Sequence, residues 1–245
     1  MSKPFLVIQL RPEDATAESE FAAIKQFGGL SDGETVGLRA ERNGISPIDL
    51  NAYSAIIVGG SPFDVSTPKQ QKSPIQHKIE GDFHTLFDTI TDQDFPFLGC
   101  CSGNGLLGSY CGATISGKYR EAVGGVDIEI TAAGQRDSLL EGFPPTIRAL
   151  VGHKEACDTL PPGCELLATS SSCPVQMFRL KQNIYATQFH PEADAEGFAI
   201  RINIYRHHGY FDPATADDLI ATLRKEKTPY AQMILHRFVE RYRQI

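Results

Sequence analysis

Two adjacent cysteines stand inside a glycine-rich stretch, FPFLGCCSGNGLLGSYCG, at residues 95–112. The pattern predicts a strand, a sharp turn and a helix. A nucleophile at such a turn needs strained backbone angles and small residues two positions to either side. Cys101 meets this requirement, since Gly99 and Gly103 flank it, whereas Cys100 does not. An ordinary tight turn fits the same pattern, so the stretch alone leaves two interpretations of Cys101 open.

The position of each cysteine predicts a different environment. A thiol just before a helix N-terminus feels unpaired N–H groups and the positive end of the helix dipole. We therefore expect the pKa of Cys101 to be lowered. Cys100 belongs to the strand and is expected to be a small buried residue.

Acyl transfer by a thiol needs a base and a third group that orients the base. In YATQFHPEAD an apolar strand ends at His190, and Pro191 stops that strand. Glu192 follows two residues later, close enough for its carboxylate to reach the imidazole. The sequence therefore predicts His190 as the base and Glu192 as its orienter. Both His190 and Cys101 are expected at carboxyl ends of strands, where open α/β sheets place their sites.

The other histidines give weaker signals. His153, in VGHKEAC, is expected in a loop near the sheet edge, and its role stays open. Five more are expected on solvated helical surfaces: His77, His84, His207, His208 and His236.

An oxyanion hole requires donors aimed at the developing negative charge. The backbone N–H of Ser102, directly after the cysteine, is one candidate. A second is Gly60 or Gly59 in the glycine loop VGGSPFDVSTP, residues 58–68. An ordinary turn remains the alternative interpretation of that loop.

The elements that must position these residues alternate along the chain. Near-continuous apolar runs at residues 5–10, 35–40, 55–60 and 95–100 predict buried strands, and residues 75–90 predict a helix. This alternation indicates an α/β fold with a mostly parallel sheet covered on both faces. Four later strand-like pieces, GGVDIEI, TIRALVG, PVQMFRL and NIYATQF, suggest antiparallel additions. We expect one domain over residues 1–210 and a helical extension over 211–245, in which Asp212 and Pro213 begin a helix.

Composition narrows the class of protein. The 245 residues carry a net charge of −7, which argues against nucleic acid or an anionic membrane as the main partner. The first residues lack the pattern of a secretory signal, and no apolar run approaches the roughly 20 residues of a membrane span. The six cysteines show no paired C-x-x-C spacing of a zinc site. A cytoplasmic location with reduced thiols, and no metal, is the expectation.

Three ordered motifs, GGSPFDV, FLGCCSGNGLLG and QFHPEAD, together resemble the class I glutamine amidotransferases. The likeness covers roughly residues 50–210 and is greatest to stand-alone domains similar to the amidotransferase half of GMP synthase. It implies a three-layer, flavodoxin-like fold and a triad of Cys101, His190 and Glu192. It also implies an oxyanion hole from Gly60 and Ser102. Cys101 would attack the side-chain amide of glutamine, release ammonia and form a γ-glutamyl thioester, with no cofactor.

The chain departs from the family pattern around the substrate. The family usually has G-x-C-x-G-x-Q, and Gly105 stands here in place of that glutamine, after Asn104. His153 and Glu155 loosely match an S-H-x-D stretch of the glutamine pocket. The resemblance thus implies a substrate site that includes Gly59, Asn104, His153 and Glu155.

Several functions remain open at this level. No motif for activating an ammonia acceptor is visible, so a separate synthase subunit would have to supply one. Alternatively, the chain hydrolyses small γ-glutamyl compounds as a peptidase. Proteins related to DJ-1 also carry an elbow cysteine, but they place a histidine directly after it, where this chain has Ser102. A non-enzymatic alternative is a regulatory protein that has lost activity. Its best support is Gly105, which stands in place of the family glutamine.

Overall fold

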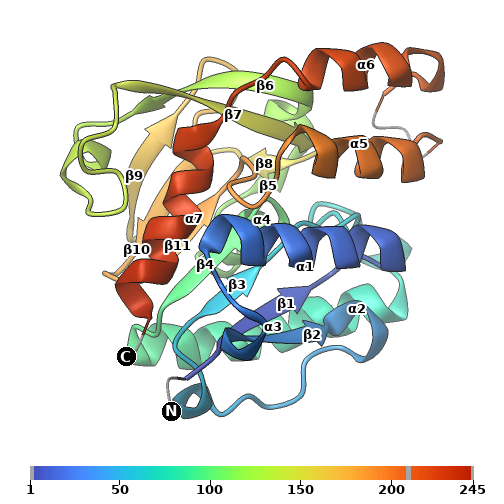
Figure 1. Cartoon of the computed structure of the whole chain (residues 1–245). Helices are drawn as coiled ribbons and strands as arrows, with labels where there is room; N and C mark the ends of the chain where they lie inside the picture. The colour runs from blue at the N-terminus through green and yellow to red at the C-terminus, as the bar shows by residue number, and fades with distance from the viewer. Residues whose placement is uncertain (1–2, 208–210, 244–245) are drawn as a thin grey trace.

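A nine-stranded sheet forms the centre of the molecule in the computed structural model, which describes residues 3–207 and 211–243 (Figure 1). Its strand order is β2-β1-β3-β4-β11-β10-β9-β6-β7, and β5 and β8 form a separate pair. The strands are β1 (Phe5–Gln9), β2 (Thr35–Arg39), β3 (Ile56–Val58), β4 (Phe97–Cys100), β5 (Ile115–Ser116), β6 (Glu121–Ile130), β7 (Thr146–His153), β8 (Ala156–Cys157), β9 (Cys164–Thr169), β10 (Met177–Leu180) and β11 (Ile184–Thr187). The helices are α1 (Asp14–Gly28), α2 (Ala40–Asn43), α3 (Pro74–Gln93), α4 (Ser102–Tyr110), α5 (Ala195–Ile204), α6 (Ala216–Leu223) and α7 (Pro229–Tyr242).

The predicted α/β class and mostly parallel centre are confirmed. Strands β2, β1, β3, β4 and β11 pair in parallel, and β10, β9, β6 and β7 continue the sheet in antiparallel fashion. One part of the prediction was wrong: β11, expected among the antiparallel additions, lies parallel to β4. The antiparallel strand β9 has no counterpart among the predicted strands.

Alternating side chains of the central strands pack into two separate hydrophobic cores, one on each face of the sheet. Phe5 and Val7 of β1 pack with residues of α1 and α7 on one face of the sheet. Leu6 and Ile8 of the same strand pack with α3 and α4 on the other face. This alternation is the period-two geometry of a strand buried on both sides, and it produces the three layers.

The cap residues explain where the helices begin. Ser73 accepts a hydrogen bond from the Gln76 amide and precedes Pro74, the first residue of α3. Asp194 accepts one from the Gly197 amide at the start of α5. The predicted Asp212 cap is present too, but on a short 3-10 turn, Pro213–Thr215, that leads into α6.

A third, smaller core joins α5 and α6 to the far strands of the sheet. It contains Phe198 and Ile202 of α5, Ile220 of α6 and Leu150 of β7. This packing holds α5 beside the carboxyl ends of the parallel strands. Among the described residues, the helices are all too short or too polar to cross a membrane.

Candidate active site

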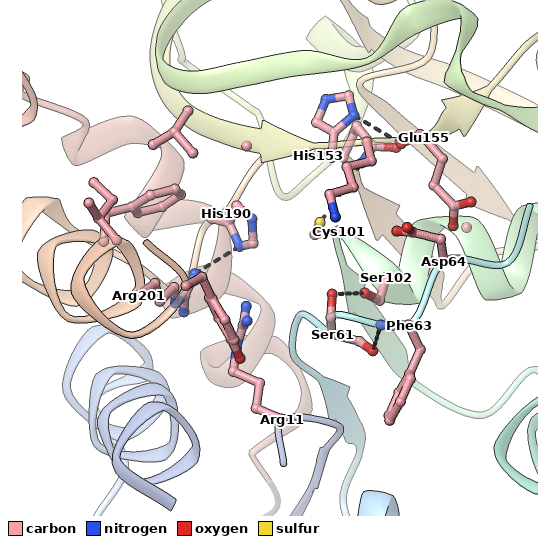
Figure 2. A pocket seen from close by; sticks show the side chains of 18 of the residues that line it. Arg11, Ser61, Phe63, Asp64, Cys101, Ser102, His153, Glu155, His190 and Arg201 are labelled. Carbon is pink, nitrogen blue, oxygen red and sulfur yellow. Dashed lines mark hydrogen bonds between the residues drawn. The ribbon is translucent and has the colours of Figure 1, made fainter. Parts of the chain in front are cut away.

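A cavity opens where β4 and β11 end, and both Cys101 and His190 line it. In Figure 2, the Cys101 sulfur lies between two groups of side chains. His190 and Arg201 approach from the α5 side, and Asp64 and Glu155 approach from the opposite side. The cysteine and the histidine predicted to act together, which are far apart in the sequence, therefore face the same space.

The backbone at Cys101 has the turn that the glycine pattern predicted. Cys101 separates β4 from α4 and has φ 53° and ψ −92°. This conformation is energetically unfavourable for any residue other than glycine. A Cβ on Gly99 would lie 2.8 Å from the Gly103 carbonyl carbon, closer than real Cβ contacts come. A Cβ on Gly103 would make only ordinary contact, 3.6 Å from Val58. The turn therefore depends on Gly99 more than on Gly103.

Cys100 points to the other face of the sheet. It is fully buried and belongs to the core formed with α1 and α7. Burial raises the pKa of its thiol well above the ordinary value. These features match the expected buried strand residue.

His190 and Glu192 form a close pair. Nδ1 of His190 lies 2.6 Å from Oε1 of Glu192, and both side chains are buried. Burial alone would raise the pKa of Glu192, but the His190 imidazole and Arg201 outweigh it and hold the pKa at about 2. Burial lowers the pKa of His190, although Glu192 opposes that shift. The imidazole is therefore neutral at neutral pH, oriented by a carboxylate and able to accept a proton.

The pKa of Cys101 differs from the prediction. Burial raises it to about 12, and the positive charges of Arg11 and Arg201 oppose this shift without reversing it. The expected lowering by the helix N-terminus is outweighed because the thiol sits in a site surrounded by protein. A protonated thiol beside a neutral imidazole is thus the favoured resting state.

Three charged residues that the sequence reasoning missed lie beside the His190–Glu192 pair. Glu20 of α1 accepts a hydrogen bond from Nε of Arg11 at 2.8 Å and one from Arg201 at 3.3 Å. Arg201 also lies 3.4 Å from Glu192. We call Arg11, Glu20, Glu192 and Arg201 the buried ion cluster. Two signals could have found it: Arg11 comes soon after β1 at the carboxyl edge, and Glu20 is an acidic residue on the buried face of α1.

The predicted oxyanion donor Gly60 is engaged elsewhere in this structure. Its N–H donates to Oε1 of Glu20 at 3.1 Å, so the amide is satisfied by a carboxylate. In this conformation the Gly60 amide is therefore not free to act as the predicted donor. Ser102 differs, since it is the first residue of α4 and its N–H has no carbonyl partner within the helix.

Two of the predicted substrate contacts are placed away from the cavity. Gly59 packs against Glu20, and a Cβ there would lie 2.1 Å from Oε2 of that residue. Asn104 is fully buried, and its Oδ1 lies 3.4 Å from the Cys157 sulfur. Neither is among the described residues that line the cavity.

His153 and Glu155 do line the cavity, but both are committed to internal hydrogen bonds. Nε2 of His153 lies 2.8 Å from Glu121, and its Nδ1 lies 2.9 Å from the Glu155 carbonyl oxygen. The Glu155 carboxylate accepts from the Val65 and Ser66 amides, each at 2.7 Å. Glu155 therefore holds the loop of residues 61–68 over one end of the cavity.

The same carboxylate is the nearest neighbour that a side chain at position 105 would meet. A Cβ on Gly105 would lie 3.4 Å from Oε1 of Glu155 and 3.7 Å from the Val65 side chain. Both are ordinary contacts, so a Cβ fits at this position, and Glu155 and the loop that it holds are the neighbours that a longer side chain would meet.

The remaining histidines agree with their predicted positions where they are described. His77, His84, His207 and His236 are exposed, and His208 lies outside the described residues. Among the described residues, one group of side chains could hold a metal ion: Glu121, His153 and Cys173, whose donor atoms lie within 4.8 Å of one another. Glu121 already accepts hydrogen bonds from His153, Gln176 and Ser172, so internal donors occupy its oxygens.

Comparison with known proteins agrees with the motifs. The family model of class I glutamine amidotransferases matches residues 34–207. One subunit of the glutamine-hydrolysing GMP synthase from Sulfurisphaera tokodaii is 30% identical over 179 residues, which cover 69% of this chain and 88% of that protein. The corresponding subunit from Pyrococcus abyssi is 28% identical over 113 residues, 46% of this chain and 58% of that protein.

Solved structures share the fold. A glutamine amidotransferase from Thermotoga maritima superimposes with a TM-score of 0.71 at 22% identity, covering 96% of this chain and 98% of that one. A glutamine amidotransferase from Methylobacillus flagellatus gives a TM-score of 0.71 at 20% identity, covering 98% and 95%. The family match spans well over half of the sequence and includes the cysteine turn and His190. This chain belongs to the class I glutamine amidotransferase family.

Proposed function

We propose that the chain is a cysteine amidohydrolase that cleaves a γ-glutamyl amide bond, with Cys101 as nucleophile, His190 as base and Glu192 as orienter. One observation carries the proposal: a histidine bound to a buried glutamate at 2.6 Å lines the same cavity as a cysteine on a strained turn. Nucleophile, base and orienter are the minimum set for thiol acyl transfer.

The favoured protonation states determine the first step. Because the thiol is protonated and His190 is neutral, the imidazole removes the thiol proton as sulfur attacks the γ-carbonyl carbon. The carbon–nitrogen bond then breaks, and His190 returns that proton to the departing nitrogen. Water, activated by the same imidazole, hydrolyses the γ-glutamyl thioester to glutamate and restores the thiol.

The N–H of Ser102 is the donor best placed for the developing oxyanion, at the positive end of α4. Gly60 can add a second donor only if its amide leaves Glu20. Ser102 therefore supplies the donor that is available without a rearrangement, and a second donor requires one.

The charged end of the cavity suits the amino-acid part of a γ-glutamyl group. Asp64, Lys154 and Glu155 line that end. Burial raises the pKa of the Asp64 carboxyl, and the nearby Lys154 opposes that shift. We assign this end to the α-amino and α-carboxylate groups of the substrate, which carry charges of both signs.

The test measures glutamate released from glutamine and from small γ-glutamyl amides. Cys101→Ala should abolish release, and Cys100→Ala should retain it, because Cys100 is packed in the buried core and does not line the cavity. Equal activity in wild type and Cys101→Ala would overturn the proposal. Loss of activity in Cys100→Ala with retention in Cys101→Ala would mean that the proposal names the wrong cysteine as nucleophile.

The relatives favour a second candidate, in which this chain supplies ammonia to a separate synthase subunit. The S. tokodaii and P. abyssi proteins are each named as one subunit of a glutamine-hydrolysing synthase. Strong stimulation of glutamine hydrolysis by a co-purified synthase subunit would support this candidate. Full turnover by the isolated chain would support the hydrolase.

A further inference from the structure

The cavity changes in chemical character from one end to the other. Asp64, Lys154 and Glu155 line the end closed by the loop of residues 61–68. At the other end, Phe198, Ile202 and Phe211 line the cavity and belong, with Val123, to one hydrophobic cluster. We call these four residues the apolar wall. Figure 2 shows Cys101 between the two ends, with His190 and Arg201 on the side from which α5 approaches.

The position of the base decides which part of the substrate meets the apolar wall. In the proposed reaction His190 gives its proton to the departing nitrogen, so that nitrogen must lie beside the imidazole. The His190 ring packs edge-on against Phe198, with ring centroids 5.1 Å apart. Any group attached to the departing nitrogen therefore extends toward the apolar wall.

The apolar wall lines the cavity itself, so a group on the departing nitrogen would meet it inside the site. Phe198 and Ile202 are already buried, whereas Val123 and Phe211 are only partly buried. Free glutamine has only hydrogen atoms on its amide nitrogen and would leave the exposed parts of Val123 and Phe211 uncovered. An apolar substituent would remove those exposed parts of Val123 and Phe211 from water, which is favourable.

The buried ion cluster argues against a charged substituent. Arg11 and Arg201 supply two positive charges at this end, and Glu20 and Glu192 supply two negative charges in direct contact with them. The cluster is therefore balanced, and neither guanidinium is left as an unshared cation for a carboxylate. A carboxylate beside the wall would lose its hydration without gaining a full charge partner.

We infer that the cavity takes γ-glutamyl amides of uncharged apolar amines in preference to glutamine and to γ-glutamyl amino acids. The inference rests on the proposed function and specifies its leaving group. The apolar wall is the amine subsite, and the end lined by Asp64, Lys154 and Glu155 is the glutamyl subsite.

Three compounds test this directly: glutamine, γ-L-glutamyl-phenethylamide and γ-L-glutamyl-L-phenylalanine. The last two carry the same benzyl group and differ only by a carboxylate. We expect kcat/KM for the phenethylamide to exceed each of the others by about tenfold or more, the discrimination that one apolar group or an unpaired charge provides. Equal or higher kcat/KM for glutamine, or for the γ-glutamyl-phenylalanine, would overturn the inference and leave the proposed hydrolase intact. No hydrolysis of any of the three would overturn both.

A matched pair of variants locates the preference. Phe211→Ala shortens the apolar wall, and Phe63→Ala removes an aromatic ring from the opposite end of the same cavity. Both side chains are half-buried. Phe211→Ala should lower the ratio of kcat/KM for phenethylamide over glutamine about fivefold to tenfold, whereas Phe63→Ala should change both substrates by a similar factor. An unchanged ratio in Phe211→Ala, or an equal fall in both variants, would contradict the assignment of the wall.

Discussion

The backbone N–H of Cys101 donates a 2.7 Å hydrogen bond to the carbonyl oxygen of Thr187. This bond extends the parallel pairing of β4 and β11, in which Thr187 lies opposite Cys100. His190 follows Thr187 by three residues, so the pairing that fixes the cysteine turn also brings the imidazole to the same edge of the sheet. Parallel pairing is essential here, since an antiparallel β11 would end at the opposite edge.

The two glycines that flank the cysteine should respond differently to alanine. Gly99→Ala places a Cβ 2.8 Å from the Gly103 backbone, and we expect it to lower the free energy of unfolding by about 1–3 kcal/mol and to reduce activity strongly. Gly103→Ala meets only the Val58 side chain at ordinary distance and should be nearly neutral in stability. Urea denaturation of both variants measures this, and equal losses would contradict the described turn.

The acid limb of the pH–rate profile should reflect the protonation of His190. The imidazole must be neutral to accept the thiol proton, and burial lowers its pKa below the ordinary 6.5. We therefore expect kcat/KM to stay constant as the pH falls to about 6.5 and to decrease only at lower pH. Glu192→Gln removes the carboxylate that raises this pKa, so the limb should move to still lower pH while kcat drops roughly 10²–10⁴-fold. An acid limb centred above pH 6.5, or a shift of the limb to higher pH in Glu192→Gln, would contradict the assignment of His190 as the base.

Restoring the glutamine of the family pattern should impair the enzyme. In Gly105→Gln the added side chain extends into the space of the Glu155 carboxylate, which holds the Val65 and Ser66 amides. Losing one such charge-assisted bond costs about 1.5–3 kcal/mol, so KM should rise about tenfold or more. Gly105→Ala, whose Cβ makes ordinary contacts, is the matched control and should behave like wild type. A gain of glutamine hydrolysis in Gly105→Gln would show that the site lacks only that side chain.

Removing the central carboxylate of the buried ion cluster should destabilise the protein. Glu20→Ala leaves Arg11 and Arg201 without their shared partner, and breaking a buried ion pair costs about 3–5 kcal/mol. Glu18→Ala, on the exposed face of the same helix, should change the free energy of unfolding by less than about 0.5 kcal/mol. Chemical denaturation compares the two, and a small effect of Glu20→Ala would mean that the arginines find other partners.

Local patterns predicted the parts of the site that lie within one segment. The flanking glycines identified the turn at Cys101, and the spacing in His190-Pro191-Glu192 predicted the buried pair. Apolar runs located β1, β3 and β4 within a few residues of their observed ends. In each case the residues that cause the feature are neighbours in the chain.

Features that depend on contacts between distant segments could not be predicted from the sequence. Glu20 turns the Gly60 amide away from the cavity, a contact between residues 40 positions apart that no local pattern encodes. The raised pKa of Cys101 results from the protein around the thiol, whereas the helix N-terminus alone favoured a lowered one. The apolar wall likewise arises because α5, which carries no chemical motif of its own, lies beside His190.

The proposed reaction requires the Cys101 sulfur to attack a γ-glutamyl carbonyl carbon. Incubation with the glutamine analogue 6-diazo-5-oxo-L-norleucine, followed by peptide mass spectrometry, locates the reacting atom. We expect one adduct, on Cys101, and its absence in His190→Ala. An adduct on Cys100, or none on the intact protein under conditions where it hydrolyses γ-glutamyl amides, would contradict it.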